Sequence, residues 1–378
     1  MSIFDPASTD APPAGVTDQA TAAPRPDAIT LDPGHDAVSR RLADHTTFRI
    51  GGEADHLVVA HDPTELIDAV TSADDRGEPV LIISGGSNML VSDEGFPGTV
   101  VVVATRGLTT QVDHDGGVRL QVAAGQGWDD LVAHTVDHCF SGLETLSGIP
   151  GLVGAAPMQN IGAYGAEVRQ SVTRVHTFDR RRRELVSFEA SDCAFGYRTS
   201  RFKQEPDRHV ILSVEFLLHS SPNSQPVKYA ELARHLGVDP GESAPIDRVR
   251  QAVITIRRSK GMVLDAADHD TWSAGSFFTN PILTADQAAH LPPEAPRYDQ
   301  GAGQVKTSAA WLIDHAGIHK GFGDGPAQVS SAHVLALTNR GAATASDVLD
   351  LARLIRDRVL DTYQVRLEPE PVLVGLSL

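Results

Sequence analysis

Apolar and polar positions in the first part of the chain alternate between strand-like and helix-like spacing. Residues 54–60 and 79–83 are short apolar runs of the kind that form buried strands, and residues 63–77 between them have the spacing of an amphipathic helix. We therefore predict a β–α–β unit. A Gly-Gly turn precedes it, and residues 45–50, HTTFRI, are predicted to form an additional strand before that turn.

The second of these apolar runs leads into a loop with almost no side chains, Ser84-Gly85-Gly86-Ser87-Asn88. Glycine-rich loops that follow strands often bind phosphate, because bare backbone N–H groups can converge on an anion. Here the chain continues through VSDEGFPGTVVVV into another strand and not into a helix. Neither GxGxxG nor GxxxxGK[ST] is present, so a Rossmann NAD domain and an ordinary P-loop NTPase are disfavoured.

From about residue 100 to 220 the pattern is mostly that of strands. Hairpins are predicted at Asp115-Gly116-Gly117 and around Asp179–Arg183. The second hairpin carries four arginines, which we interpret as solvated turn residues in preference to an anion site. A helix is predicted between the hairpins, at residues 127–139.

The sequence pattern changes after residue 222, where segments with helical spacing alternate with short strand-like runs and indicate an α+β domain. Residues 365–375 read as a final strand that returns toward the first domain. The predicted divisions are a disordered tail (1–37), a first subdomain (38–107), a second subdomain (108–221), a further α+β domain (222–358) and a C-terminal return strand (359–378).

Composition and charge limit the kinds of binding partner, and the cellular compartment, that we expect for this protein. Against 49 acidic residues there are 32 Lys and Arg, a formal charge of −17, so nucleic acid and anionic membrane are disfavoured as partners. Cys139 and Cys193 are the only cysteines and predict buried thiols in a reducing compartment. The first residues lack the apolar segment of a signal peptide, and we expect a cytoplasmic protein.

His134 and His138 lie four residues apart on the predicted helix, as zinc ligands do. No carboxylate stands beside His134 in the catalytic place, and no third ligand follows. We interpret them as ordinary helix-surface histidines and expect no metal.

The densest signal is the glycine-rich run of residues 142–168, GLETLSGIPGLVGAAPMQNIGAYGAEV. Glycine lets a backbone approach a ligand closely and adopt positive φ. A run of this length predicts a wall against a large ligand, and together with the loop at 84–88 it suits a dinucleotide held by backbone amides.

Three other segments attract attention, although each also has an ordinary structural interpretation. CAFGYRTSRFK places Tyr197 beside Arg198, WSAGSFFTNP holds Ser276 in a turn, and LEPEP offers Glu368 and Glu370. Alone, the arginine suits a salt bridge, the serine a turn or cap, and the glutamates a solvated strand edge.

Taken together, TTFRIGG, SGGSN, LSGIPGLVGAAPMQNIGAYG, CAFGYRTSRFK, AGSFFTNP and LEPE resemble the UDP-N-acetylenolpyruvoylglucosamine reductase family of peptidoglycan precursor synthesis, over roughly residues 40–378. The resemblance implies an α+β fold: a two-subdomain FAD-binding fold of the vanillyl-alcohol-oxidase type, plus a smaller α+β substrate domain. It also implies NADPH as hydride donor and a UDP-sugar enolpyruvyl ether as substrate. Ser87-Asn88 stands where many relatives in the wider fold carry a tethering His, so FAD is expected to be noncovalent.

The resemblance also assigns roles to residues. Those matching the FAD-contacting loops are Ser84, Gly85, Gly86, Ser87, Asn88, Gly148, Ile149, Pro150, Gly151 and Gly154. Those matching substrate-contacting positions are Tyr197, Tyr229, Lys260 and Asn280. Tyr229 implies the branch of the family in which a tyrosine loop closes over the UDP diphosphate.

Arg198, Ser276 and Glu370 match the catalytic positions. Arg198 and Glu370 are expected to stabilise negative charge that develops when hydride adds to the vinyl carbon. Ser276 is expected to protonate the adjacent carbon, with Lys260 as one candidate for restoring its proton. Whether Glu368 or Glu370 faces the substrate stays open.

Two other functions remain possible from the sequence. A flavin oxidase of the same fold acting on an alcohol or hydroxy acid would react with oxygen and need no Ser276. A nucleotide-binding module would bind a UDP-sugar or flavin without oxidising NADPH.

Overall fold

The computed structural model describes residues 38–378, so the tail predicted at residues 1–37 lies outside the described residues. Its first sheet has three parallel strands in the order β1-β4-β2. The elements are β1 (Ala54–Ala60), α1 (Pro63–Asp75), β2 (Val80–Ile83) and β4 (Phe96–Val103). The predicted β–α–β unit is therefore confirmed, with the later strand β4 inserted between its two strands.

The strand predicted at residues 45–50 is wrong. Residues Leu42–His45 form a 3₁₀ helix, and residues 46–50 that follow form turns and irregular structure but no strand. The Thr47 N–H donates to the carbonyl of Gly86, so this segment is bonded to a loop and not to a neighbouring strand. Phe48 and Ile50 are buried in the C-terminal core, which accounts for the apolar pattern that suggested a strand.

The second sheet is antiparallel and has six strands, ordered β11-β10-β12-β6-β5 with the short β7 also paired to β12. Its strands are β5 (Leu108–Val112), β6 (Gly117–Ala123), β7 (Phe140–Ser141), β10 (Val172–Asp179), β11 (Glu184–Glu189) and β12 (His209–Ser220). Both predicted hairpins are confirmed, as β5–β6 and β10–β11. The predicted helix is α2 (Trp128–Asp137).

One hydrophobic core joins the two sheets and buries the indole of Trp128. The apolar run of β4 supplies Val101 and Val103 to this core and Val100 and Val102 to a second core on the opposite face. Because both faces of β4 are buried, its sequence reads as continuous valine and not as an alternating pattern.

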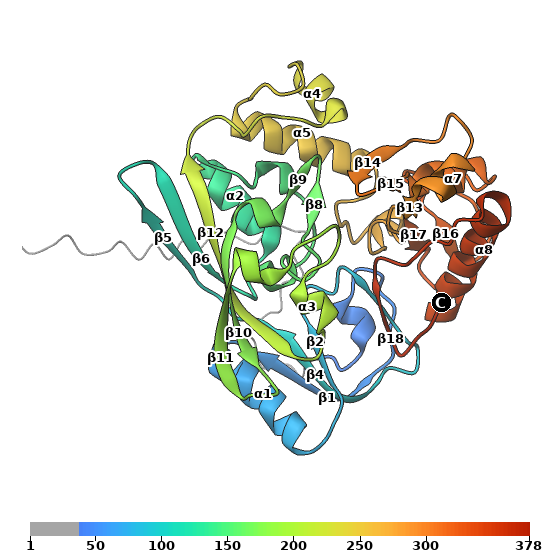
Figure 1. The fold of residues 1–378 in the computed structure, drawn as a ribbon. Coiled ribbons are helices and arrows are strands. Elements are labelled where there is room, and N and C mark those ends of the chain that lie inside the picture. Colours follow the sequence, from blue (N-terminus) through green and yellow to red (C-terminus); the bar gives the residue numbers. More distant parts are fainter. Residues whose placement is uncertain (1–37) are drawn as a thin grey trace, which may run out of the picture.

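The helices predicted after residue 222 are present (Figure 1). They are α4 (Ala230–Leu236), α5 (Ile246–Ser259), α6 (Ala285–Ala289), α7 (Ala309–His315) and α8 (Ala345–Tyr363). The strands among them are β13 (Ile282–Thr284), β14 (Tyr298–Gly301), β15 (Gln304–Lys306), β16 (Ala327–Val329) and β17 (Leu337–Asn339). Helices α4 and α5 share a core of their own, and α5 lies against α2.

The predicted return of the C-terminus is confirmed. Strand β18 (Val372–Val374) pairs in parallel with β3 (Met89–Val91), which directly follows the loop at 84–88. The pairing brings Glu370 next to that loop, since the Val372 N–H donates to the carbonyl of Asn88. The remaining short elements are β8 (Gly162–Ala163), β9 (Ala166–Glu167) and α3 (Arg201–Gln204).

The prediction of two buried thiols is half wrong. Cys193 is buried, and burial raises its pKa to about 12, but Cys139 is exposed beyond the end of α2. Cys139 follows the helix with φ of 56°, and this chain reversal turns it outward. His134 and His138 stack at the end of α2, with ring centroids 4.2 Å apart. In residues 38–378 no group of three His, Cys, Asp or Glu side chains is arranged to hold a metal.

No helix among residues 38–378 is both long enough and apolar enough to cross a membrane. The proposed domain boundaries remain predictions; within the range 222–358 the chain contributes to two separate hydrophobic cores.

Candidate active site

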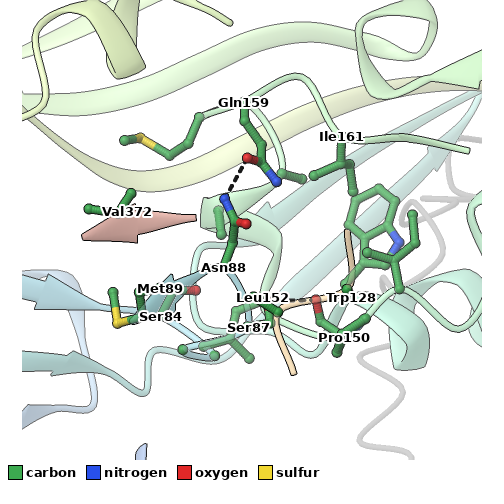
Figure 2. Close-up of a pocket in the computed structure, with 18 of the residues that line it drawn as sticks. Ser84, Ser87, Asn88, Met89, Trp128, Pro150, Leu152, Gln159, Ile161 and Val372 are labelled. Atoms are coloured by element: carbon green, nitrogen blue, oxygen red, sulfur yellow. Dashed lines mark hydrogen bonds between the residues drawn. The ribbon is translucent and has the colours of Figure 1, made fainter. Parts of the chain in front are cut away.

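A cavity of about 620 Å³ lies where the two glycine-rich loops, the end of α5 and the C-terminal segment meet. Figure 2 shows the part of it around the loop at 84–88. The predicted site residues among its lining are Ser84, Gly85, Gly86, Ser87, Asn88, Ile149, Pro150, Gly154, Arg198, Tyr229, Lys260, Ser276 and Glu370. Gly148, Gly151, Tyr197 and Asn280 are not among the residues that line it.

The two glycine-rich loops are in direct contact. A Cβ atom added to Gly85 would lie 2.6 Å from the Cα of Gly151, so no side chain fits at Gly85 without moving the second loop. The Ser87 hydroxyl donates to the carbonyl of Pro150 at 2.9 Å. The structure therefore forms the opposed pair of loops that the sequence predicted, with Gly151 packed directly against the first loop.

Two polar side chains of the first loop have different surroundings. The hydroxyl of Ser84 is buried and has no hydrogen-bond partner among the described residues, although it lines the cavity. Asn88 donates to Oε1 of Gln159 at 2.6 Å (Figure 2) and to the carbonyl of Glu370 at 3.3 Å. An unpaired buried hydroxyl is costly, and a ligand in the cavity would remove that cost.

Arg198 and Glu370 form an ion pair inside the cavity, with Nε 3.0 Å from Oε1. The Nε–H group of Arg198 is not directed at this oxygen well enough for a hydrogen bond, so Nε has no hydrogen-bond acceptor among the described residues. Nη2 donates to the carbonyl of Gly162 at 2.9 Å, and Arg198 has a φ of 53°. A non-glycine residue in this left-handed region costs conformational energy, and such strain is common at functional sites.

Burial raises the pKa of the Glu370 carboxyl, and the positive charges of Arg198 and Lys203 only partly oppose this. Glu368 has a different environment: its side chain is 68% exposed, against 11% for Glu370, and it lies 3.5 Å from Arg366. Of the two glutamates, Glu370 is the one that lines the cavity.

Ser276 lines the cavity beside the C-terminal segment, because the Glu370 N–H donates to the carbonyl of the next residue, Phe277, at 2.8 Å. Its backbone forms a β-bridge with Ala336, and the next N–H, that of Phe277, donates to the carbonyl of Leu335 at 2.8 Å. Phe277 and Phe278 are buried in the C-terminal core. The two rings anchor the turn and leave the serine at the cavity surface.

Tyr197 and Asn280 contact each other next to Arg198. The Asn280 N–H donates to the Tyr197 hydroxyl at 3.3 Å, and Oδ1 of Asn280 accepts from the N–H of Ala309 at 2.9 Å. Asn280 thus connects the start of α7 to Tyr197. Lys306 lies over the Tyr197 ring, with Nζ 4.8 Å from the centroid.

Tyr229 and Lys260 stand at the open end of the cavity. Tyr229 packs edge-on against Tyr164, with centroids 5.5 Å apart, and is 42% exposed. Nζ of Lys260 donates to Oε2 of Glu231 at 2.7 Å. This contact ties Lys260 to the segment that begins with Tyr229, and not to Ser276.

Comparisons with known proteins agree on one family. A family model described as "UDP-N-acetylenolpyruvoylglucosamine reductase, C-terminal domain" matches residues 266–374, and one described as "FAD binding domain" matches residues 54–181. UDP-N-acetylenolpyruvoylglucosamine reductase from Cutibacterium acnes is 54% identical over 89% of this chain and 90% of the relative. The enzyme of that name from Streptomyces coelicolor is 49% identical over 92% of this chain and 93% of the relative. The chain belongs to the UDP-N-acetylenolpyruvoylglucosamine reductase family.

A solved structure supports the fold as well. UDP-N-acetylenolpyruvylglucosamine reductase from Thermus caldophilus is similar with a TM-score of 0.61 and 26% identity, covering 88% of this chain and 97% of that one. The predicted fold class, an FAD-binding fold with a further substrate domain, is confirmed. The cavity also fits FAD in its chemistry, because two bare loops and the unpaired Ser84 hydroxyl offer polar groups to a large ligand.

Several residues that line the cavity were not predicted from the sequence of this reductase. They are Gln159, Tyr164, Arg180, Lys203, Arg257 and His333. The first two and Lys203 stand inside motifs quoted above, so the motifs themselves carried a signal for them. Arg180 was included among the solvated hairpin arginines, which is wrong: it pairs with Asp74 at 2.7 Å and lines the cavity, whereas Arg181–Arg183 are exposed.

Lys203 and His333 are the missed residues with the clearest electrostatic signature. Nζ of Lys203 donates to the carbonyl of Arg198 at 3.2 Å, and burial lowers its pKa. Burial lowers the pKa of His333 to about 4, helped by the positive charge of Lys260 and other nearby cations. His333 is therefore a neutral imidazole at neutral pH, and no motif in its segment points to it.

Proposed function

We propose that this protein reduces UDP-N-acetylglucosamine enolpyruvate to UDP-N-acetylmuramate with NADPH as the electron donor. The observation that carries the proposal is that Arg198, Glu370 and Ser276, from three distant parts of the chain, line one cavity with the two glycine-rich loops. Family membership supports the same reaction. The two loops would hold FAD, which would supply the hydride-transfer chemistry between NADPH and the vinyl carbon of the substrate.

Arg198 and Glu370 are assigned to the enolpyruvyl carboxylate. Hydride addition to the terminal vinyl carbon pushes negative charge toward this carboxylate, and a fixed guanidinium stabilises charge that develops there. Burial raises the pKa of Glu370, so its carboxyl takes up a proton more readily than an exposed glutamate and in that form would donate a hydrogen bond to the same oxygens. The carboxyl and guanidinium are held in advance by their mutual contact, so little reorganisation is needed during the reaction.

Ser276 is assigned as the proton donor to the carbon adjacent to the one that receives hydride. A serine hydroxyl is a weak acid, so its proton must be replaced from a neighbour as it is transferred. The contact between Lys260 and Glu231 supports a different task for Lys260, at the diphosphate end of the substrate beside Tyr229. Arg257 adds a second cation at that end of the cavity.

NADPH and the UDP-sugar are proposed to use this cavity in turn. The described residues provide one cavity bordered by these loops, and a dinucleotide and a nucleotide sugar both need cations for their phosphates. We also infer a cytoplasmic location, since both proposed substrates belong to cytoplasmic pools.

The test is a two-step absorbance experiment on the purified protein loaded with FAD. NADPH added without oxygen should bleach the flavin band near neutral pH, and the enolpyruvyl UDP-sugar should restore it with formation of one lactyl ether per flavin. Restoration by oxygen but not by the enolpyruvyl compound would indicate an oxidase of the same fold. Binding without bleaching would indicate a module that does not turn over. Double-reciprocal plots of the steady-state rate should be parallel at low substrate concentration. Intersecting plots would indicate that both substrates are bound at once and would contradict their use of one cavity in turn.

A further inference from the structure

The backbone of Gly148 is held on both sides by side chains from two helices. Its N–H donates to Oδ1 of Asp129 at 2.6 Å, and its carbonyl accepts from Nε of Arg257 at 3.1 Å. Gly148 itself has a φ of 69°, a conformation that favours glycine. Gly148, within the second glycine-rich loop, is therefore held by charged side chains from outside that loop.

Asp129, in the first turn of α2, is fixed in turn by α5. Arg250 donates from Nη1 to Oδ1 at 2.6 Å and from Nη2 to Oδ2 at 2.8 Å, a two-point contact of defined geometry. The Arg250 side chain is 12% exposed and that of Asp129 38%, so the contact is partly shielded from solvent. Arg250 and Arg257 stand seven residues apart, two turns along the same face of α5.

Helix α5 thus holds both backbone polar groups of Gly148. Arg257 donates to the carbonyl directly, and Arg250 holds Asp129, which accepts from the N–H. The same helix ends at Lys260, and Arg257 and Lys260 both line the cavity. Figure 1 shows α5 next to α2, and the two helices are in contact. The bonds between the loop and α5 are short and partly buried. We therefore expect a displacement of either one to displace the other.

We propose that Asp129 is a positioning residue that couples the flavin-facing loop to helix α5, so that FAD and the UDP-sugar each favour binding of the other. The inference rests on the proposed function, since it takes the loop at 148–151 to face FAD and α5 to face the diphosphate. The coupling is reciprocal: if the bound sugar nucleotide holds α5 in place, FAD must bind more tightly, and by the same factor.

Three variants separate this role from plain structural support. Asp129→Asn keeps an oxygen but removes the charge, and Arg250→Met leaves the bond from Asp129 to Gly148 while removing the connection to α5. The exchange Asp129→Arg with Arg250→Asp restores an ion pair between the helices but leaves the Gly148 N–H without an acceptor. Asp113→Asn is the matched control, because Asp113 pairs with Arg119 at 3.0 Å on the β5–β6 hairpin and does not line the cavity.

The measurements are the dissociation constant of FAD, followed by flavin fluorescence, with and without saturating UDP-N-acetylmuramate, and the thermal midpoint of each protein. Asp129→Asn should weaken FAD binding by roughly 10- to 150-fold, the range expected for a hydrogen bond to a charged group. Arg250→Met should weaken FAD binding less, and should abolish the tightening of FAD by the sugar nucleotide. The exchanged pair should regain thermal stability without regaining FAD affinity.

Several results would overturn the inference. FAD affinity within twofold of the unsubstituted protein for Asp129→Asn, or full recovery of both stability and affinity in the exchanged pair, would make Asp129 a structural residue only. The same conclusion follows if the unsubstituted protein shows no tightening of FAD by the sugar nucleotide, or if Asp113→Asn weakens FAD equally. Failure of the unsubstituted protein to bind FAD at all would instead remove the proposed function. Should Asp129→Asn not fold, Arg250→Met decides the question through its coupling.

Discussion

The guanidinium of Arg198 lies 3.0 Å from the carboxyl of Glu370, although 172 positions separate them in the chain. Two features bring the residues together: the left-handed turn at Arg198 and the pairing of β18 with β3 beside the first glycine-rich loop. The Arg198 carbonyl is held in turn by Lys203. A buried carboxyl with two cations nearby is suited to share a proton with a substrate carboxylate.

Replacing Glu370 with Gln should change how stability depends on pH. Burial raises the folded-state pKa of Glu370 above its ordinary value of 4.5. Its contribution is therefore fully present below the unfolded pKa and is lost as pH rises through the folded pKa. Glu370→Gln does not ionise, so its free energy of unfolding should gain on the unsubstituted protein as pH rises.

The measurement is urea unfolding at fixed excess FAD across about pH 4 to 8. Glu368→Gln is the matched control, because the Glu368 side chain is exposed and does not line the cavity. An unchanged difference between Glu370→Gln and the unsubstituted protein over this range would show that Glu370 titrates normally.

Ser276→Ala should separate the two half-reactions. Bleaching of the flavin by NADPH needs no proton from Ser276 and should proceed near the unsubstituted rate. Reoxidation by the enolpyruvyl substrate needs a proton on carbon and should slow by about 10²–10⁴-fold, the usual effect of losing a positioned acid. Ser276→Cys should recover part of the rate.

Stopped-flow absorbance measures both steps on the same sample. The turn itself should survive substitution, since Phe277 and Phe278 anchor it in the core. Reoxidation within about threefold of the unsubstituted rate, or equal losses in both steps, would remove Ser276 from proton transfer.

Tyr229→Phe should chiefly weaken binding of the UDP-sugar. The substitution removes one hydroxyl, and a hydrogen bond to a charged group contributes about 1.5–3 kcal/mol, or roughly 10- to 150-fold in affinity. The edge-on contact with Tyr164 survives in phenylalanine, so the loop should keep its packing. Titration calorimetry with UDP-N-acetylmuramate tests this, with flavin content expected to stay constant. Tyr363→Phe on α8 is the control, and equal affinities in both variants would place Tyr229 outside the binding site.

The flavin should leave the protein on denaturation. Ser87 and Asn88 give the first loop no histidine side chain that could bond to a flavin, and Ser87 is already bonded to Pro150. Heat or acid precipitation should therefore release free FAD into the supernatant, where absorbance and chromatography identify it. Yellow colour retained by the washed precipitate would show a covalent link.

Local sequence was sufficient for much of the fold. The helix α1 has its apolar spacing and an N-cap, Asp62, that accepts from two backbone N–H groups. The hairpins have glycine or charged turn residues between apolar runs, and the two loops have glycines at positions where a side chain would collide. These features are determined within a few residues of the chain, which is why a pattern predicts them.

The sequence pattern gave the wrong structure or exposure at three places: residues 45–50, Arg180 and Cys139. The first has the alternation of a strand, yet its Thr47 N–H bonds to Gly86 and its apolar side chains enter a distant core. Arg180 is distinguished from the arginines that follow it by Asp74, which is contributed by α1. Cys139 is turned outward by its own positive φ at the end of α2.

The site itself depended on tertiary structure in the same way. The sequence favoured Glu370 but left open whether Glu368 faces the substrate, and of the two only Glu370, next to the paired strands β18 and β3, lines the cavity. Lys203 and His333 gained shifted pKa values from burial, a property of the assembled cavity and not of either segment. Secondary structure and loop chemistry follow from neighbours along the chain, whereas ionisation, pairing and access follow from neighbours in space.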